Sequence, residues 1–213
     1  MDRGAVSSDV SRETFEKIVK IEAEKLELKL PEDFYEKGCN YLKEMLFWNK
    51  THNLTTITDF CEAALLHFAD SLVPATIEGL VFDGASVLDV GTGGGFPGVP
   101  LALIFPKAEF TLLDKARKKI SFINLTSASL GIDNVTGICE NLFVHQRHYD
   151  LIVSRAVRID AELFDCCRKM LNKNGCLCFW FSSNQDVFQD GSLKEIKLYK
   201  SGEIERKIAV YQF

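Results

Sequence analysis

The stretch LDVGTGGGFPG, at residues 88–98, decides the fold expected of this chain. It begins inside a short apolar segment, Ser86–Val90, which predicts a buried strand. The glycines that follow predict a loop whose backbone passes close to a ligand without obstruction by Cβ atoms. Because open α/β sheets bind ligands at the carboxyl ends of their strands, the stretch predicts a strand followed by a binding loop.

The glycine spacing restricts the class of ligand. A dinucleotide fingerprint, GxGxxG, needs glycine at position 96, where Phe96 stands, and no P-loop pattern occurs. A nicotinamide oxidoreductase is therefore the least favoured hypothesis. The pattern D-x-G-x-G-x-G, from Asp89 to Gly95, resembles that of class I methyltransferases, which use S-adenosylmethionine. Asp114 ends the next expected strand, about 20 residues beyond the glycines, where a carboxylate can bind ribose hydroxyls.

Strand and helix patterns alternate from about Gly84 onward. Helices are expected over 115–130 and 160–171, the second one capped by Asn174-Gly175. Only residues 200–204 separate the last two strands, which predicts an antiparallel hairpin. We expect a seven-stranded, mostly parallel α/β sheet of the Rossmann-like class I methyltransferase type, closed by this hairpin. Its strands are expected at 86–90, 109–114, 134–138, 149–154, 175–181, 193–199 and 205–212.

The first part of the chain follows helical spacing instead. Residues 1–82 are expected to form a helical extension ahead of an S-adenosylmethionine-binding domain over residues 83–213. Ser11 is a candidate cap for the first helix, and Pro31 suits the first helical position of the second. Asp59 begins a capping box that opens a third helix, expected to run through Val73.

Composition is that of a soluble globular protein. The chain has 213 residues, of which 46% are hydrophobic and 26% charged, with a net charge of -5. A protein that coats nucleic acid non-specifically would be basic, so any contact with RNA here requires a local patch.

Cysteine usage and hydropathy predict a cytoplasmic protein. Seven cysteines without a CxxC pair indicate free thiols in a reducing compartment and no metal site. Met1 to Val10 is polar, which argues against a signal peptide. The apolar runs fall short of the roughly 20 residues that span a bilayer, so no membrane association is expected. Nothing in the sequence requires a dimer, and we expect a monomer.

Several segments resemble the RsmG (GidB) family of bacterial 16S ribosomal RNA guanine-N7 methyltransferases, over roughly residues 30–213. The narrowest match is the glycine loop with its extension Phe96-Pro97-Gly98-Val99-Pro100. Glu205-Arg206 is a weaker match. Other segments agree in order and spacing: Trp48-Asn49-Lys50 with Asn53-Leu54-Thr55, His67 with Asp70-Ser71, and Ser154-Arg155-Ala156.

The resemblance implies a pocket for S-adenosylmethionine. It places Gly91 and Phe96 at the methionine and sulfonium side, Asp114 at the ribose and Arg155 at the pocket mouth. The family usually has Arg, a small residue and Glu beside adenine, where this chain has Asn141-Leu142-Phe143 and only backbone contacts are expected. A lysine and a glycine common in the family are replaced by Phe181 and Ser182. The implied cofactor set is Asp89, Gly91, Gly93, Gly95, Phe96, Asp114, Asn141, Leu142 and Arg155.

The reaction that the resemblance implies needs no general base, because guanine N7 carries a lone pair and no proton. Positioning is then the main requirement, and an arginine near guanine O6 offsets the charge that develops on the ring. Arg155 is the first candidate and Arg206 the second; the alternative for each is an ion pair. The expected partner is 16S rRNA or the small ribosomal subunit.

Residues of the helical region are candidates for RNA contact. His67, Asp70 and Ser71 are spaced i, i+3 and i+4, so they are expected to share a helix face, and Asn53 precedes them in a turn. Packing or hydrogen bonding within the protein is the alternative for all four. A basic patch is expected from Arg155 with Arg117-Lys118-Lys119, Arg158 and Arg168-Lys169, unless each is simply a solvated face.

Two other hypotheses stay open. One is a methyltransferase of the same fold that acts on a small molecule or a protein. The other is a non-catalytic module that binds S-adenosylmethionine or RNA. It is considered because Asn141 and Phe181 differ from the residues usual in the family.

Overall fold

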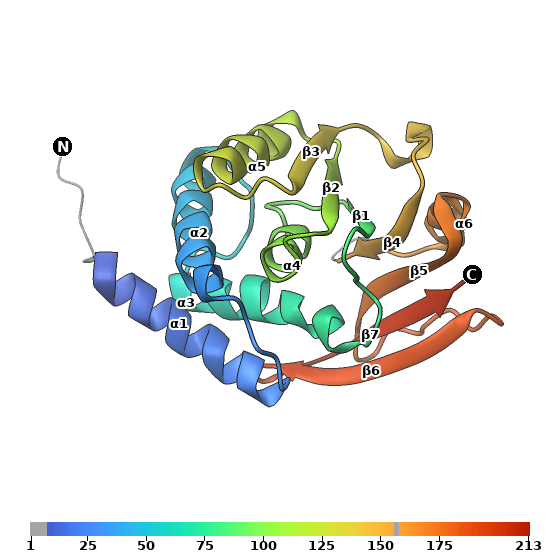
Figure 1. Cartoon of the computed structure of the whole chain (residues 1–213), viewed down its shortest axis with the longest axis horizontal. Helices are drawn as coiled ribbons and strands as arrows, with labels where there is room; N and C mark the ends of the chain where they lie inside the picture. Colours follow the sequence, from blue (N-terminus) through green and yellow to red (C-terminus); the bar gives the residue numbers. More distant parts are fainter. Residues whose placement is uncertain (1–7, 156–157) are drawn as a thin grey trace.

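The computed structural model describes residues 8–155 and 158–213 (Figure 1). Ala156, the last residue of one family-like segment, lies outside the described residues. Figure 1 shows one twisted sheet, with most of the helices gathered on one side of it and α6 on the other. The helices are α1 (Ser8–Lys25), α2 (Glu32–His52), α3 (Phe60–Ala63), α4 (Gly98–Ile104), α5 (Arg117–Ser129) and α6 (Ala161–Lys169).

Seven strands in the described part of the chain form a single sheet in the order β3-β2-β1-β4-β5-β7-β6. β7 runs antiparallel to both β5 and β6, and the other pairs are parallel. The predicted mixed sheet and its closing hairpin are therefore confirmed. The strands are β1 (Ser86–Val90), β2 (Glu109–Asp114), β3 (Val135–Cys139), β4 (Tyr149–Ser154), β5 (Leu171–Ser182), β6 (Leu193–Ser201) and β7 (Ile204–Gln212).

The start of β5 corrects the prediction for Asn174-Gly175. α6 ends at Lys169, and Asn174 lies inside β5 with a φ of 64°, so it does not cap the helix. Across the pair with β4, Tyr149 faces Leu171 while Leu151 faces Cys176. The extra residues of β5 therefore bulge out of the ladder, and the left-handed residue makes the bulge possible.

The helical region differs from the prediction at three points. α1 begins at Ser8 rather than Ser11, and Pro31 is the N-cap of α2 rather than its first residue. The carboxylate of Asp59 accepts the Glu62 amide, as a capping box requires. The helix it opens is not a continuous α-helix, because it changes to a π-helix, η1 (Ala64–Phe68), and then to a 3-10 helix, η2 (Ala69–Thr76).

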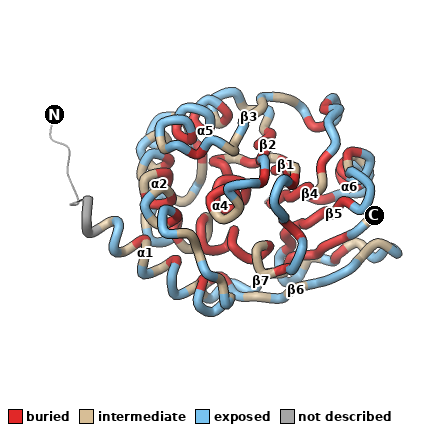
Figure 2. The backbone as a smooth tube through the Cα atoms, in the orientation of Figure 1, coloured by how far each residue is buried: buried red, intermediate tan, exposed pale blue. Residues whose placement is uncertain are grey.

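Two hydrophobic cores cover the two faces of the sheet, and Figure 2 shows the buried residues along the strands and the inner sides of the helices. The larger core joins Phe15 of α1 and Phe68 of η1 to Val87 of β1. The smaller core packs α6 against β5 and β7, with Phe164 and Phe179 at its centre. The helical region is thus packed directly on the sheet, and η1 and η2 reach the carboxyl ends of the strands. No helix of the described residues could span a lipid bilayer.

Candidate cofactor and substrate site

The glycine loop connects β1 to α4 and bends through left-handed backbone. Gly91, Gly93 and Gly95 have φ values of 69°, 60° and 97°. A Cβ atom on Gly95 would collide with the Tyr41 hydroxyl and come within 2.9 Å of Val99, so packing against α2 demands glycine here. A Cβ on Gly93 would find nothing nearer than 4.0 Å, so this part of the loop faces open space.

Asp89 holds the loop from below and keeps one carboxylate oxygen free. It is fully buried; its Oδ2 accepts hydrogen bonds from Thr92 Oγ1 at 2.6 Å and from the Gly98 amide at 2.8 Å. Its Oδ1 is also buried and has no hydrogen-bond donor among the described residues. Burial raises the pKa of Asp89 to about 6, although both hydrogen bonds act in the opposite direction. An unpaired buried oxygen beside the loop fits a ligand that brings a positively charged donor group.

Asp114, at the end of β2, lies against the same loop. Its Oδ2 accepts the Gly93 amide at 3.1 Å, and its Oδ1 accepts the Ala116 amide at 2.8 Å. Lys119 of α5 forms an ion pair with Oδ2 at 3.5 Å. The structure therefore brings Asp114, the residue predicted to bind ribose, next to the predicted loop. Lys119, which was expected in the basic patch, pairs with Asp114 instead.

Phe96 forms the aromatic side of the loop and lies under two predicted site residues. The His67 ring stacks on it, with centroids 4.7 Å apart and planes 15° from parallel. The Arg155 guanidinium carbon lies 5.7 Å from the centre of the Phe96 ring. These contacts join the loop to η1 and to the end of β4, so the side chains of residues 67 and 155 both pack against the ring of residue 96.

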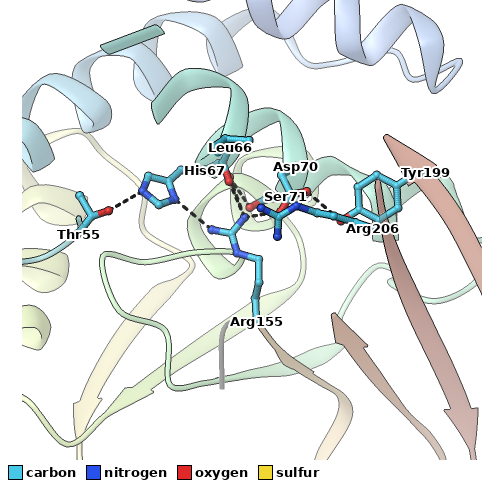
Figure 3. A network of polar contacts seen from close by, with 8 residues as sticks. All are labelled: Thr55, Leu66, His67, Asp70, Ser71, Arg155, Tyr199 and Arg206. Carbon is cyan, nitrogen blue, oxygen red and sulfur yellow. Dashed lines mark hydrogen bonds and ion pairs between the residues drawn. The ribbon is translucent and has the colours of Figure 1, made fainter. Parts of the chain in front are cut away.

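Arg155 is held in a network of polar contacts that includes Asp70 (Figure 3). Its Nη1 donates to Asp70 Oδ2 at 2.9 Å and to the Leu66 carbonyl at 3.0 Å. Asp70 Oδ1 accepts from the Tyr199 hydroxyl at 2.8 Å and lies 3.5 Å from Arg206 Nε. The Asp70 side chain is fully buried and Arg155 is 9% exposed. We name Asp70, His67, Arg155, Tyr199 and Arg206 the charge cluster.

His67 occupies the edge of the charge cluster as a neutral ring. Its Nδ1 lies 3.4 Å from Arg155 Nη2, which can only donate, so Nδ1 accepts and the ring proton is on Nε2. Nε2–H then donates to Thr55 Oγ1, 2.8 Å away. Burial, with the charges of Arg155 and Arg206, lowers the pKa of His67 to about 3. Both ring nitrogens are thus engaged within the protein.

The other residues predicted to contact RNA have structural partners or backbone roles. Ser71 is buried and donates to the His67 carbonyl at 2.5 Å. Asn53 is exposed and terminates α2 with a φ of 50°. The Thr55 amide donates to Asn49 Oδ1 at 2.9 Å, which secures the turn.

The segment expected beside adenine forms a short 3-10 helix, η3 (Leu142–Val144). Asn141 caps it, since its Oδ1 accepts the Phe143 amide at 3.1 Å. Leu142 is buried in the smaller core, whereas Phe143 is 54% exposed. The side chains of Asn141 and Leu142 thus serve the local fold, and contact of this segment with adenine stays a prediction.

Some residues of the expected basic patch are paired with carboxylates, and others are exposed. Arg155 and Lys119 are paired with buried or half-buried carboxylates. Arg168 pairs with Asp165 on the outer side of α6. Arg117, Lys118 and Arg158 remain exposed. The described residues also contain no cluster of His, Cys, Asp and Glu that could hold a metal ion.

Residues from distant elements also support the site, and no sequence pattern indicated this role. Tyr41 of α2 donates to the Gly94 carbonyl at 2.9 Å, and Met45 packs on Gly94. The Tyr199 hydroxyl, on β6, donates the remaining hydrogen bond to the buried Asp70 carboxylate. Tyr41 and Met45 are buried on α2, but no sequence signal indicated what they would touch.

Comparison with known proteins identifies the family. Residues 35–187 match GidB, rRNA small subunit methyltransferase G. The ribosomal RNA small subunit methyltransferase G of Francisella philomiragia is 36% identical over 149 residues, which cover 70% of this chain and 71% of that protein. That of Psychrobacter arcticus is 38% identical over 138 residues, covering 65% of this chain and 56% of that protein. The alignments thus span between 56% and 71% of the length of these relatives.

Solved structures of low sequence identity share the fold. TrmN from Thermus thermophilus matches with a TM-score of 0.54 at 15% identity, over 78% of this chain and 52% of that chain. Coclaurine N-methyltransferase, bound to N-methylheliamine and SAH, matches with a TM-score of 0.52 at 18% identity, over 83% of this chain and 54% of that chain. These likenesses confirm the predicted class I methyltransferase fold. Because the family match spans more than half of its residues, the chain belongs to the rRNA small subunit methyltransferase G family, as its sequence predicted.

Proposed function

We propose that this protein transfers the methyl group of S-adenosylmethionine to N7 of a guanine in 16S ribosomal RNA. Family membership supports the reaction class and the RNA. The observation that carries the proposal is the pairing of the open left-handed loop with the unpaired, buried Oδ1 of Asp89. A substrate carried by ribosomal subunits implies a cytoplasmic location. That the protein acts as a monomer remains a prediction.

The residues around the loop fit S-adenosylmethionine as a ligand. Asp89 Oδ1 would accept a hydrogen bond from the ammonium group of the methionine part, and Gly91 and Gly93 would offer open backbone beneath it. Asp114, 10% exposed in its side chain, would accept the ribose hydroxyls. The backbone of Asn141 and Leu142 would line the adenine. When bound, S-adenosylmethionine supplies a methyl group on a sulfonium, which a neutral nitrogen can take without losing a proton.

The protein side chains support positioning rather than proton transfer. His67 stacks on Phe96 of the loop, and both of its ring nitrogens are occupied, by Arg155 and Thr55. A ring held neutral and fully hydrogen-bonded does not act as a general base, and methylation at N7 requires none. Fixing the base against the donor is then the principal contribution, which can be worth effective molarities of about 10⁵–10⁸ M.

Arg155 has a positioning role in this proposal. The network of Asp70, Leu66 and His67 engages both of its terminal nitrogens, so it holds the His67–Phe96 stack and the end of β4 in register. Arg206 is the better candidate for contact with the base, because 28% of its side chain is exposed and its Nε has no acceptor among the described residues.

Methyl transfer to the ribosomal substrate tests the proposal. Small subunits from cells that lack this protein would be incubated with tritiated S-adenosylmethionine and the protein, and the label would be counted in 16S rRNA. We expect stoichiometric labelling, and loss of labelling in Asp89→Ala. If the protein binds the donor but labels no rRNA, the proposal is wrong, and a small-molecule or protein substrate, or a non-catalytic role, takes its place.

A further inference from the structure

A cavity of about 580 Å³ opens at the end of β5, next to the charge cluster. We name it the β5–β7 pocket. Arg155 lines it and also lies 5.7 Å from the Phe96 ring, so the pocket adjoins the glycine loop. Its size is within the range of about 300–1,000 Å³ typical of small-ligand sites. Among its lining residues are Arg155, Arg158, Trp180, Phe181, Glu205 and Arg206.

Two hydrogen-bond donors in the wall of this pocket have no acceptor within the described residues. Trp180 is 5% exposed, and its Nε1–H is buried and unpaired. Arg206 Nε is likewise buried and unpaired; its 3.5 Å contact with Asp70 is an ion pair without hydrogen-bond geometry. Buried N–H groups nearly always have partners in native proteins. Two unpaired donors in one pocket wall therefore indicate a ligand that brings an acceptor.

Both donors lie on the same face of the sheet. Trp180 pairs with Ile208 across the β5–β7 ladder and belongs to the larger core together with it. Arg206 is two residues before Ile208, so side-chain alternation places it on that face too, where it meets Asp70. Because both donors lie on one face, one ligand bound at the strand ends could accept hydrogen bonds from both of them.

The remaining wall provides an aromatic surface for a nucleobase. The Trp180 ring lies on the same face as the two donors, whereas Phe181 turns its ring into the smaller core on the other face. Glu205 lines the rim, where its carboxylate lies 3.7 Å from Lys200. A carboxylate repels phosphate but accepts hydrogen bonds from N–H groups of a base. Guanine presents a carbonyl, O6, beside N7, and two N–H donors, N1–H and the 2-amino group, on the adjoining edge. Adenine would instead turn its 6-amino group toward the two unpaired donors.

We propose that the β5–β7 pocket binds the target guanine, whose O6 accepts from Trp180 Nε1–H and Arg206 Nε–H while its N1–H and 2-amino groups face Glu205. The inference rests on the proposed function and names the side chains that select the base. Since O6 neighbours N7, a base held this way can turn N7 toward the glycine loop, which the pocket adjoins through Arg155. Trp180 and Glu205 then determine specificity.

The indole N–H resonances offer a direct test, because the chain has only two tryptophans. ¹⁵N-labelled protein with S-adenosylhomocysteine would be titrated with millimolar guanosine, with 2-aminopurine riboside, which lacks O6, and with inorganic phosphate. We expect guanosine alone to shift the Trp180 signal. Trp48, which packs on Phe122, is the internal control, and Trp48→Phe assigns the two signals. A shift with phosphate but not with guanosine would overturn the proposal in favour of an RNA-backbone site.

Kinetics with the ribosomal substrate provide the second test. Trp180→Phe keeps an aromatic ring and removes one hydrogen bond, so we expect kcat/KM for undermethylated subunits to fall about 3- to 10-fold. In the wild type we expect guanosine to bind roughly tenfold more tightly than inosine, which lacks the 2-amino group. Glu205→Gln would lessen that preference. Urea unfolding of each variant separates loss of recognition from loss of fold.

The two proposals fail in different ways. If wild-type protein labels no guanine N7 in 16S rRNA, the proposed function fails. If it does label N7, but Trp180→Phe keeps full kcat/KM and the Trp180 signal ignores guanosine, the reaction stands and this pocket is not the guanine site.

Discussion

The glycine loop and the charge cluster adjoin each other but are built in different ways. Within the loop, Asp89 contacts residues three and nine positions away, and Asp114 reaches back 21 positions to Gly93. In the charge cluster, Asp70 contacts residues 85 and 129 positions away. The loop depends on the backbone conformation of residues close in sequence, whereas the cluster depends on one buried carboxylate that compensates two arginines from distant parts of the chain.

This difference assigns the two regions different roles. The loop leaves an oxygen and open backbone for a ligand, so changes there should act on donor binding. The charge cluster ties η1 and η2 to the ends of β4, β6 and β7, so changes there should act on stability first. The following predictions test this division, from the largest expected effect to the smallest.

Removing the charge of Asp70 should have the largest effect on stability. Asp70→Asn leaves Arg155 and Arg206 without a buried counter-charge, which should lower the free energy of unfolding by about 3–5 kcal/mol. Asp165→Asn is the matched control, since it breaks an exposed pair with Arg168 and should cost about 0–1 kcal/mol. Urea unfolding measures both; equal losses would show that the cluster contributes no more than a surface pair.

Gly95→Ala should damage the loop by steric contact. The new Cβ would meet the Tyr41 hydroxyl and Val99 at a φ of 97°, so we expect a loss of about 2–4 kcal/mol and weaker binding of S-adenosylhomocysteine. Gly131→Ala separates the cost of the steric collision from the cost of a left-handed backbone at a residue with a side chain. Gly131 has a φ of 61° with nothing within 4 Å of a built Cβ, so it should lose only about 1 kcal/mol.

The neutral state of His67 should make stability depend on pH. Unfolded, His67 protonates below its ordinary pKa of 6.5, whereas in the folded protein the pKa is about 3. Its contribution is therefore complete above pH 6.5 and is lost as the pH falls, by about 2 kcal/mol at pH 5. Asp89 changes stability in the opposite direction: because its pKa is raised in the folded protein, its protonation favours the folded state as the pH falls.

Comparing the wild type with His67→Gln cancels the Asp89 contribution, since both proteins retain Asp89. The difference between their unfolding free energies should shrink between pH 7 and pH 5. A difference that stays constant over this range would mean that His67 is protonated as easily in the folded protein as in the unfolded chain.

Donor binding should depend on the ionisation of Asp89. With a pKa of about 6 in the free protein, most of its carboxylate is protonated at pH 5, so affinity for S-adenosylhomocysteine should fall about tenfold between pH 7 and pH 5. Asp89→Asn keeps an oxygen that can accept from Thr92 and Gly98 but should bind weakly at both values. If calorimetry finds that the affinity of the wild type does not change with pH, Asp89 Oδ1 does not bind the donor.

The smallest effect is expected from the hydroxyl of Tyr41. Tyr41→Phe removes its hydrogen bond to the Gly94 carbonyl and leaves the ring packed, so stability should fall by about 1 kcal/mol. The same hydroxyl is the group that a Cβ on Gly95 would strike. Tyr41→Phe should therefore recover part of the loss in Gly95→Ala, and strictly additive losses in the double variant would show that the two residues do not interact.

Local sequence was sufficient to predict the loop and most of the sheet. Apolar runs with turn residues between them located β1, β2 and β4, and the glycine spacing located the left-handed loop after β1, because these features are encoded within a few residues. The start of β5 was missed because a bulge at Asn174 imitates a helix cap, and left-handed asparagine serves both.

The charge cluster could not be predicted from spacing alone. An α-helical spacing of His67, Asp70 and Ser71 predicted a shared face, and His67 and Asp70 do meet Arg155 together. The helix there is π and then 3-10, however, and Ser71 turns its hydroxyl to its own helix. That Arg155 pairs with Asp70 and that Tyr199 completes the site depends on the packing of η2 against the hairpin, which no local pattern encodes.

Mapping the modified atom tests the proposed reaction most directly. Small subunits lacking the modification would be treated with S-adenosylmethionine and this protein, and their 16S rRNA would be cleaved with borohydride and aniline, which break the chain at N7-methylguanosine. We predict cleavage at one guanine, present with the wild type and absent with Asp89→Ala. No new cleavage with wild-type protein that binds the donor, or methyl transfer to any other atom, would contradict guanine-N7 methylation.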